Sequence, residues 1–323
     1  MIVINKKASE NFRILHITDL HMLPNEWTEG HEVRKSVIKT VNELVERVKP
    51  DLITHGGDFS GAEYPESYTK FAEFLDSFDI PWTTVWGNHD NRCGEEVTRK
   101  YAEQFLNCRN FKYEHGPKEL GNGNFVIGIN ENGRIIHALV LMDSHDRVEY
   151  TDNKGDKMKV YAFLNHEQKI WYKEVVSRLD NVGCNSSTLM CHTPIYGFKN
   201  VFIKVYNQLY DNPKNIEYKD SINGECWYDC YRDKCFGVRY EGECSYPVDD
   251  GVTDVIKELG STKLVVCGHD HVNCTCIEYD GIKYLYGLKT GRGSYFDERL
   301  NGGSVIEIDS NGNTLVRHEF VDL

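Results

Sequence analysis

Apolar and polar positions follow two different periods along the first third of the chain. Short apolar runs occupy residues 12–18, 51–54 and 82–86, and their length and composition are typical of buried β-strands. Apolar residues recur with helical spacing at 29–49, 66–78 and 95–106, which predicts amphipathic helices. The resulting β-α-β-α-β order through Asp90 predicts an α/β fold.

Strands follow one another more closely in the rest of the chain. We expect them at 125–129, 135–142, 188–191, 263–266, 275–279, 282–286, 304–308 and 314–320, with helices at 166–179 and 250–259. Asp280-Gly281 and Asn311-Gly312 are turn signals that join the last four of these strands into two hairpins. The pattern therefore predicts two stacked sheets with helices outside.

The segment 193–247 interrupts this pattern. It is aromatic-rich and weakly periodic, and a segment this long inside a compact domain is usually functional. We expect it to cap one side of the functional site; a peripheral excursion on the outer helices is the alternative. Three states remain open for its cysteines, which are two local disulfides, a structural zinc ion or free thiols at Cys226, Cys230, Cys235 and Cys244.

Composition narrows the class of protein. With 323 residues and 40% hydrophobic content, the chain predicts one large domain, 1–323, that includes the insertion. A formal net charge of −13 argues against a nucleic-acid polymer as partner, because phosphate backbones bind basic surfaces. The sequence shows neither a signal peptide nor an apolar run that would span a membrane, so we expect a cytoplasmic location and no membrane partner. A secreted protein whose signal peptide has been removed is the alternative.

Polar residues cluster where five of the predicted strands end. The clusters are Asp19-Leu20-His21, Gly57-Asp58, Gly87-Asn88-His89-Asp90, Cys191-His192 and Gly268-His269-Asp270-His271. Ligands of α/β folds gather beyond the carboxyl ends of strands, so carboxylate, amide and imidazole groups should meet at one rim. One cluster alone would indicate only a turn, but five together predict a site for two metal ions.

The order of these clusters resembles the calcineurin-like metallophosphoesterase superfamily, whose pattern is D-x-H, G-D, G-N-H-[DE], H, G-H-x-H. The resemblance runs from about Phe12 to about Asp309. Residues 164–171 and 268–273 look like the branch that contains purple-acid-phosphatase-29-like and yeast Dcr2-like proteins. The resemblance implies a four-layer α/β/β/α sandwich, in which two mixed sheets are flanked by helices.

The resemblance also implies a division of roles among the site residues. It assigns the first metal to Asp19, His21, Asp58 and His271, and the second metal to Asp58, Asn88, His192 and His269. The ions would be divalent or mixed-valence Fe, Mn or Zn. His89 is expected as the general acid, with Asp90 orienting its imidazole. His145 and Arg292 are weaker candidates for substrate contacts.

One departure from the family pattern concerns colour. Purple members carry a tyrosine three residues after the Asp of the second cluster, and its charge transfer to Fe(III) produces the colour. That position is Gly61 here, and the nearest tyrosine is Tyr64. We therefore expect a colourless protein without a tyrosinate ligand.

Several remaining residues are expected to be structural. We place His16 and His55 in the core beside the ligand clusters, and we expect Cys191 to face the core because neighbours in a strand point to opposite sides. The other histidines are expected at the surface or at helix caps; they are His31, His115, His137, His166 and His318.

The leading functional hypothesis is a metal-dependent phosphoesterase. It would hydrolyse phosphomonoesters through a hydroxide bound by the dinuclear centre, without a covalent intermediate. The substrate could be a small molecule, a nucleotide or a phosphoprotein. One alternative is a phosphodiesterase acting on cyclic nucleotides or related diesters, and another is an inactive binding protein that retains the fold.

Overall fold

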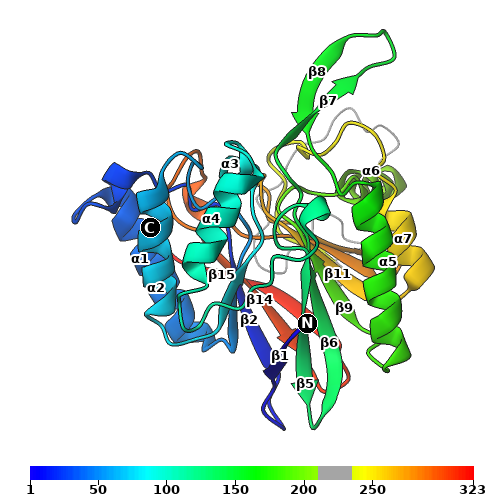
Figure 1. The fold of residues 1–323 in the computed structure, drawn as a ribbon, viewed down its shortest axis with the longest axis horizontal. Coiled ribbons are helices and arrows are strands. Elements are labelled where there is room, and N and C mark those ends of the chain that lie inside the picture. The colour runs from blue at the N-terminus through cyan, green and yellow to red at the C-terminus, as the bar shows by residue number, and fades with distance from the viewer. Residues whose placement is uncertain (210–234) are drawn as a thin grey trace.

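The computed structural model describes residues 1–209 and 235–323, in which two large mixed sheets lie face to face (Figure 1). The strand order of the larger sheet is β1 (Ile2–Asn5), β5 (Phe125–Glu131), β6 (Arg134–Leu141), β9 (Ser187–Met190), β11 (Thr262–Cys267), β13 (Ile282–Tyr286), β12 (Cys276–Tyr279) and β10 (Cys235–Phe236). The order of the smaller sheet is β15 (Thr314–Phe320), β14 (Gly302–Ile308), β2 (Phe12–Ile17), β3 (Leu52–His55) and β4 (Trp82–Thr84).

Parallel pairing brings the important strand ends together. In the smaller sheet β2, β3 and β4 are parallel neighbours, and in the larger sheet β6, β9, β11 and β13 are. Parallel strands end at the same edge of their sheet, so the segments that follow them lie side by side.

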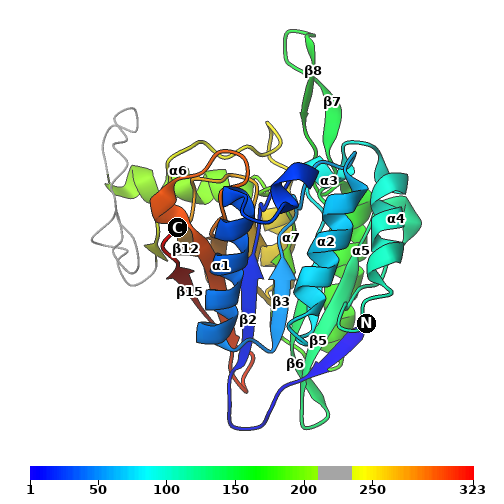
Figure 2. The same ribbon diagram turned by 90° about the vertical axis from the view of Figure 1, so that its left-hand side faces the viewer.

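Helices cover the outer faces of both sheets (Figures 1 and 2). Those beside the smaller sheet are α1 (Glu32–Val48), α2 (Pro65–Asp76), the short α3 (Asn88–Asn91) and α4 (Glu95–Phe105). Those beside the larger sheet are α5 (His166–Asn181), α6 (Gly197–Leu209) and α7 (Val252–Leu259). Short 3₁₀ turns lie at Pro24–Trp27, Lys118–Leu120 and Glu298–Leu300. The expected four-layer sandwich is confirmed.

Side-chain alternation in the larger sheet divides the core into two layers. Leu264 and Val266 of β11 point toward the smaller sheet and belong to the cluster between the sheets. Val265 points the other way and packs with side chains of α5 and α7. A strand buried on both faces shows the continuous apolar run from which β11 was predicted.

Three features were missed in the sequence. Strand β1 is short, and the hairpin of β7 (Arg147–Thr151) and β8 (Lys157–Tyr161) stands out from the body with most of its side chains partly or fully exposed (Figures 1 and 2). Strands of five residues with so little burial carry too few apolar residues for a clear pattern. Helix α6 lies in the insertion that we described as weakly periodic, and it packs near β12.

Two histidines that we expected at the surface or at helix caps are buried. His137 lies between the hydroxyls of Ser186 (3.0 Å) and Thr188 (2.9 Å), and burial lowers its pKa to about 4. His318 contacts the Ser304 hydroxyl (3.0 Å), and burial also lowers its pKa to about 4. Hydroxyl partners from neighbouring strands, which the local sequence does not reveal, make burial of the neutral rings possible.

The insertion does not contain the two disulfides that we favoured. Cys235 is disulfide-bonded, whereas Cys244 carries a free thiol. A second disulfide would need Cys244, and a four-cysteine zinc site would need both thiols. Cys226 and Cys230 lie outside the described residues, as does the central part of the expected cap.

No helix in the described ranges is both long and apolar enough to cross a membrane.

Truncating a buried side chain in the layer between the sheets should destabilise the folded protein. Leu264→Ala removes a fully buried side chain at the inter-sheet face and should lower the free energy of unfolding by about 2–5 kcal/mol. The matched control Lys263→Ala, at the exposed neighbouring position, should change it by less than about 0.5 kcal/mol. Denaturant titration measures both, and equal effects would contradict the assignment of the two faces of β11.

Candidate metal centre

Seven polar side chains converge at the carboxyl ends of strands from both sheets. From the smaller sheet, Asp19 and His21 follow β2, Asp58 follows β3 and Asn88 begins α3 after β4. From the larger sheet, His192 follows β9, and His269 and His271 follow β11. These are the seven positions for which the sequence predicted metal ligation, and the structure brings them into one buried group.

The first subgroup surrounds a space between Asp19, His21, Asp58 and His271. The Nε2 atoms of His21 and His271 are 3.0 Å apart. Asp19 Oδ1 lies 3.4 Å from His271 Nε2, and Asp58 Oδ2 lies 3.4 Å from His21 Nε2. Two imidazole nitrogens and two carboxylates at this spacing form a donor set for a divalent cation.

The second subgroup is centred on His192. Its Nε2 atom lies 3.2 Å from Asn88 Oδ1, 3.3 Å from Asp58 Oδ2 and 3.2 Å from His269 Nδ1. Asp58 Oδ2 therefore faces both subgroups, as a carboxylate that bridges two ions would.

Backbone carbonyls orient two of the imidazoles. His192 Nδ1 contacts the carbonyl oxygen of Gly56 at 2.8 Å, and His271 Nδ1 contacts that of Tyr295 at 2.8 Å. A carbonyl only accepts hydrogen bonds, so each Nδ1 carries a proton and each Nε2 is the nitrogen that would bind a metal ion. The residues therefore fit a pair of transition-metal ions.

The electrostatics of the centre favour added positive charge. Burial alone would favour the neutral acids, but contacts with His271 and His192 hold the pKa values of Asp19 and Asp58 well below their usual range. Burial lowers the pKa of His269 to about 3, so its ring is neutral. Burial alone would lower the pKa of His192, but the Asp58 carboxylate raises it to about 10, so a cation at the centre would replace a proton there.

Four ligand residues adopt left-handed backbone conformations. Their φ angles are positive at Asp19 (58°), His21 (47°), Asp58 (59°) and His269 (77°). Such conformations are unfavourable for residues other than glycine, and they cluster at functional sites. Here they turn the chain sharply after each strand, so that the side chains point toward the centre.

Asp90 does not orient His89 as we expected. Its carboxylate accepts hydrogen bonds from the backbone N–H groups of Asp58 (2.8 Å), Phe59 (3.2 Å) and Gly87 (2.8 Å) and from the Tyr68 hydroxyl (2.6 Å). These donors occupy the acceptor oxygens, so Asp90 positions the loop of the bridging Asp58 instead of the His89 ring.

His89 lies at the edge of the first subgroup. Its ring meets that of His21 edge-on, with centroids 4.8 Å apart, and its Nδ1 atom contacts Arg92 at 3.4 Å. Both histidines line a cavity of about 240 Å³. The sequence did not identify Arg92, although it follows Asp90 by only two residues.

The two weaker candidates have other partners. His145 contacts Glu95 (3.1 Å) and Gln168 (3.2 Å), and Arg292 pairs with Glu298 (3.2 Å). These contacts provide no support for a role of either side chain in substrate binding.

Other residues beside the centre came from segments without a motif. Tyr161 of β8 packs edge-on against His269, with ring centroids 4.3 Å apart. The buried Lys289 donates a hydrogen bond to the carbonyl oxygen of Asp19 at 2.7 Å. Cys244, near the end of the insertion, lies within 4.8 Å of ligand atoms of His269 and Asp270. The end of the insertion therefore borders the centre.

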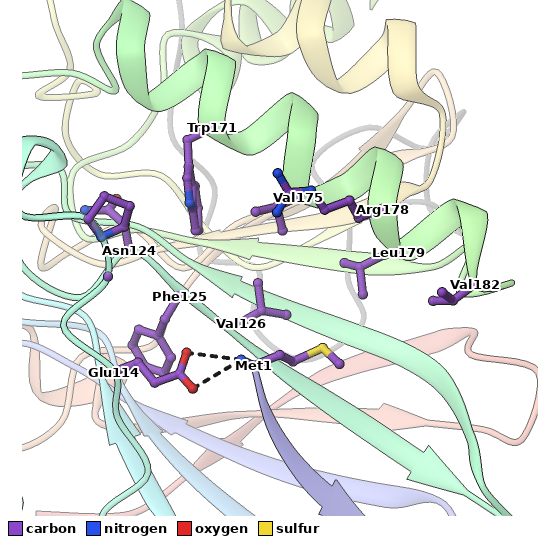
Figure 3. Close-up of a pocket in the computed structure, with 12 residues that line it drawn as sticks. Met1, Glu114, Asn124, Phe125, Val126, Trp171, Val175, Arg178, Leu179 and Val182 are labelled. Carbon is purple, nitrogen blue, oxygen red and sulfur yellow. Dashed lines mark hydrogen bonds and ion pairs between the residues drawn. The ribbon is translucent and has the colours of Figure 1, made fainter.

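A second cavity lies elsewhere and contains none of these ligands. Its volume is about 430 Å³, and Figure 3 shows Trp171, Val175 and Leu179 of α5 facing Val126 of β5 across it. Its apolar lining does not resemble a phosphate site.

Comparisons with known proteins agree with the geometry. A family model described as calcineurin-like phosphoesterase matches residues 12–273. The chain is 22% identical to a protein named probable inactive purple acid phosphatase 28 from Arabidopsis thaliana, over 88% of this chain and 71% of that protein. It is 24% identical to phosphatase DCR2 from Saccharomyces cerevisiae, over 94% of this chain and 52% of that protein. A dimetal phosphatase from Danio rerio has a similar fold, with a TM-score of 0.53 and 12% identity over 96% of this chain and 99% of that one.

The hydrogen bonds that Asp90 accepts should make metal affinity sensitive to the loss of one of its carboxylate oxygens. Asp90→Asn places an NH₂ group against two hydrogen-bond donors, so the Asp58 loop should shift and metal affinity should fall by about 10–100-fold. Tyr68→Phe, the control, removes one donor only and should have a smaller effect. Competition with a fluorescent zinc chelator measures both, and unchanged affinity in Asp90→Asn would contradict the positioning role.

Proposed function

Because the chain belongs to the calcineurin-like phosphoesterase family, we propose that it hydrolyses phosphomonoesters at this dinuclear centre. The observation that carries the proposal is the Asp58 oxygen that lies within 3.4 Å of His21 Nε2 and within 3.3 Å of His192 Nε2. We infer a phosphoester substrate that is a small molecule, a nucleotide or a phosphoprotein.

Two bound ions would supply charge neutralisation at the phosphoryl group and a lowered pKa for the attacking water. The protein's own part is to hold the ligands in place and to contact the leaving group. His89 borders the cavity beside the first subgroup, so its ring is placed to donate to the leaving oxygen. Cys191 packs in the apolar layer outside the larger sheet, which supports direct attack by water without a cysteine nucleophile.

The donor set of imidazole, carboxylate and amide suits Fe, Mn or Zn. We propose that no tyrosinate takes part, because Gly61 lines the cavity without a side chain and Tyr64 immediately precedes α2. Iron-loaded protein should therefore show no charge-transfer band in visible absorption spectra. A band at about 550 nm, the region expected for Fe(III)–tyrosinate, would contradict this.

A second candidate is an inactive protein that binds phosphoesters. Three relatives carry "probable inactive" in their names, and those words describe the relatives. In the present chain the seven ligand positions and His89 are occupied by residues suited to their roles, which favours an enzyme.

Two substitutions separate metal binding from chemistry. Asp58→Asn should abolish phosphatase activity and lower metal content, because the shared carboxylate is lost. His89→Ala should lower kcat by about 10²–10⁴-fold while both metals remain bound. Elemental analysis and a panel of p-nitrophenyl phosphate and its bis-ester measure these effects.

Each outcome bears on a different part of the proposal. Near-normal turnover of Asp58→Asn would overturn the two-metal assignment, and metal loss in His89→Ala would make His89 a ligand. Faster hydrolysis of the bis-ester by the wild-type protein would favour a diesterase. A metal-loaded wild-type protein that hydrolyses neither ester would favour the binding protein.

A further inference from the structure

The cavity beside the metal centre is lined in part by residues that are not candidate metal ligands. Its lining includes His21, His89, Arg92, Gly61 and Ser60. Ser60 is buried, and its hydroxyl has no hydrogen-bond partner among the residues that the structure describes.

The absence of a side chain at Gly61 leaves room for Arg92 and Glu63 at the edge of the cavity. A Cβ atom there would overlap the guanidinium of Arg92 and the carboxylate of Glu63. The Arg92–Glu63 ion pair thus fills the space that any side chain at position 61 would need, and it is pressed against the backbone at the cavity's edge.

Glu63 holds Arg92 in a fixed orientation. The guanidinium donates two hydrogen bonds to this carboxylate, one of them from Nε at 2.8 Å and the other from Nη2. Paired contacts of this kind fix the plane of the guanidinium. The remaining nitrogen, Nη1, lies 3.4 Å from His89 Nδ1.

This contact selects one form of the His89 ring. A guanidinium only donates hydrogen bonds, so Nδ1 must accept, and the proton of the neutral imidazole then sits on Nε2. A nitrogen of the same ring lies within 4.8 Å of ligand atoms of His21 and Asp58. Asp90, which we had expected to orient this ring, instead accepts a hydrogen bond from the backbone N–H of Asp58.

We propose that Glu63 and Arg92 are a positioning pair that holds His89 as the Nε2–H tautomer, with this N–H directed at the leaving oxygen of the substrate. The ring then donates a hydrogen bond to the oxygen as the P–O bond breaks and negative charge develops there, and the released oxyanion takes its proton from solvent water. This inference rests on the proposed phosphatase function.

Dependence on the leaving group tests the pair. Arg92→Ala should lower kcat for phenyl phosphate by about 10–10²-fold, below the range expected on removing His89 itself. It should lower kcat for p-nitrophenyl phosphate much less, because that leaving group is stable without a hydrogen bond. Glu63→Gln and Arg92→Lys should fall between wild type and Arg92→Ala, because neither keeps the paired contact.

Gly61→Ala provides a second, independent variant. This substitution removes no polar group, but its added methyl group displaces the Arg92–Glu63 ion pair. It should therefore steepen the leaving-group dependence as Arg92→Ala does. The matched control is Arg178→Ala, which breaks an exposed arginine–glutamate pair with Glu174 on α5 and should change neither rate.

A spectroscopic readout separates this inference from the proposed function. Long-range ¹H–¹⁵N spectra of the zinc-loaded protein should show a protonated Nε2 at His89 in wild type, and a loss of this preference in Arg92→Ala. If wild type hydrolyses no phosphoester, the proposed function fails while the tautomer is still measured.

The inference is overturned if Arg92→Ala keeps its metals and shows the wild-type leaving-group dependence and tautomer. Lower unfolding free energy with no change in either readout would make the pair a structural tether between the Asp58 loop and α3.

Discussion

A single carboxylate oxygen, Oδ2 of Asp58, holds the architecture of the site together. It faces His21 from the smaller sheet and His192 from the larger one, so both sheets must present their strand ends to the same point. The carboxylate is buried and ionised, which in a protein interior requires compensating charge. The parallel pairing, the layered packing and the acceptor bonds of Asp90 all serve to place this one group.

The fold class and the residues that assemble at the centre could be predicted from the sequence, because both depend on local patterns. Buried strands leave apolar runs, and clusters such as Gly87-Asn88-His89-Asp90 follow them directly. Contacts between residues far apart in the chain give no local sequence pattern from which they could be predicted. Asp90 bonds to a loop 32 residues away, and nothing in the sequence distinguishes Arg92 from an ordinary exposed arginine. The β7–β8 hairpin escaped prediction because its strands are only five residues long and contain few apolar residues.

The centre also shows where the fold accepts local instability for function. Left-handed backbone at Asp19, His21, Asp58 and His269 costs of order 1–3 kcal/mol at each residue. Glycine at any of these positions would relax the backbone but would remove a ligand atom. Stabilising substitutions are therefore to be sought in the inter-sheet core and on the outer helices, away from the strand ends.

Because ligands come from strands far apart in the chain, only the folded protein can assemble the whole donor set. Thermodynamic linkage then turns metal supply into folding stability: an ion at a free concentration a hundredfold above its dissociation constant adds about 2.7 kcal/mol. Differences of this size change the steady-state abundance of a protein in a cell several-fold through degradation of unfolded chains. The proposed centre, because it joins two sheets, would make the amount of this protein, and not only its activity, depend on the supply of metal ions.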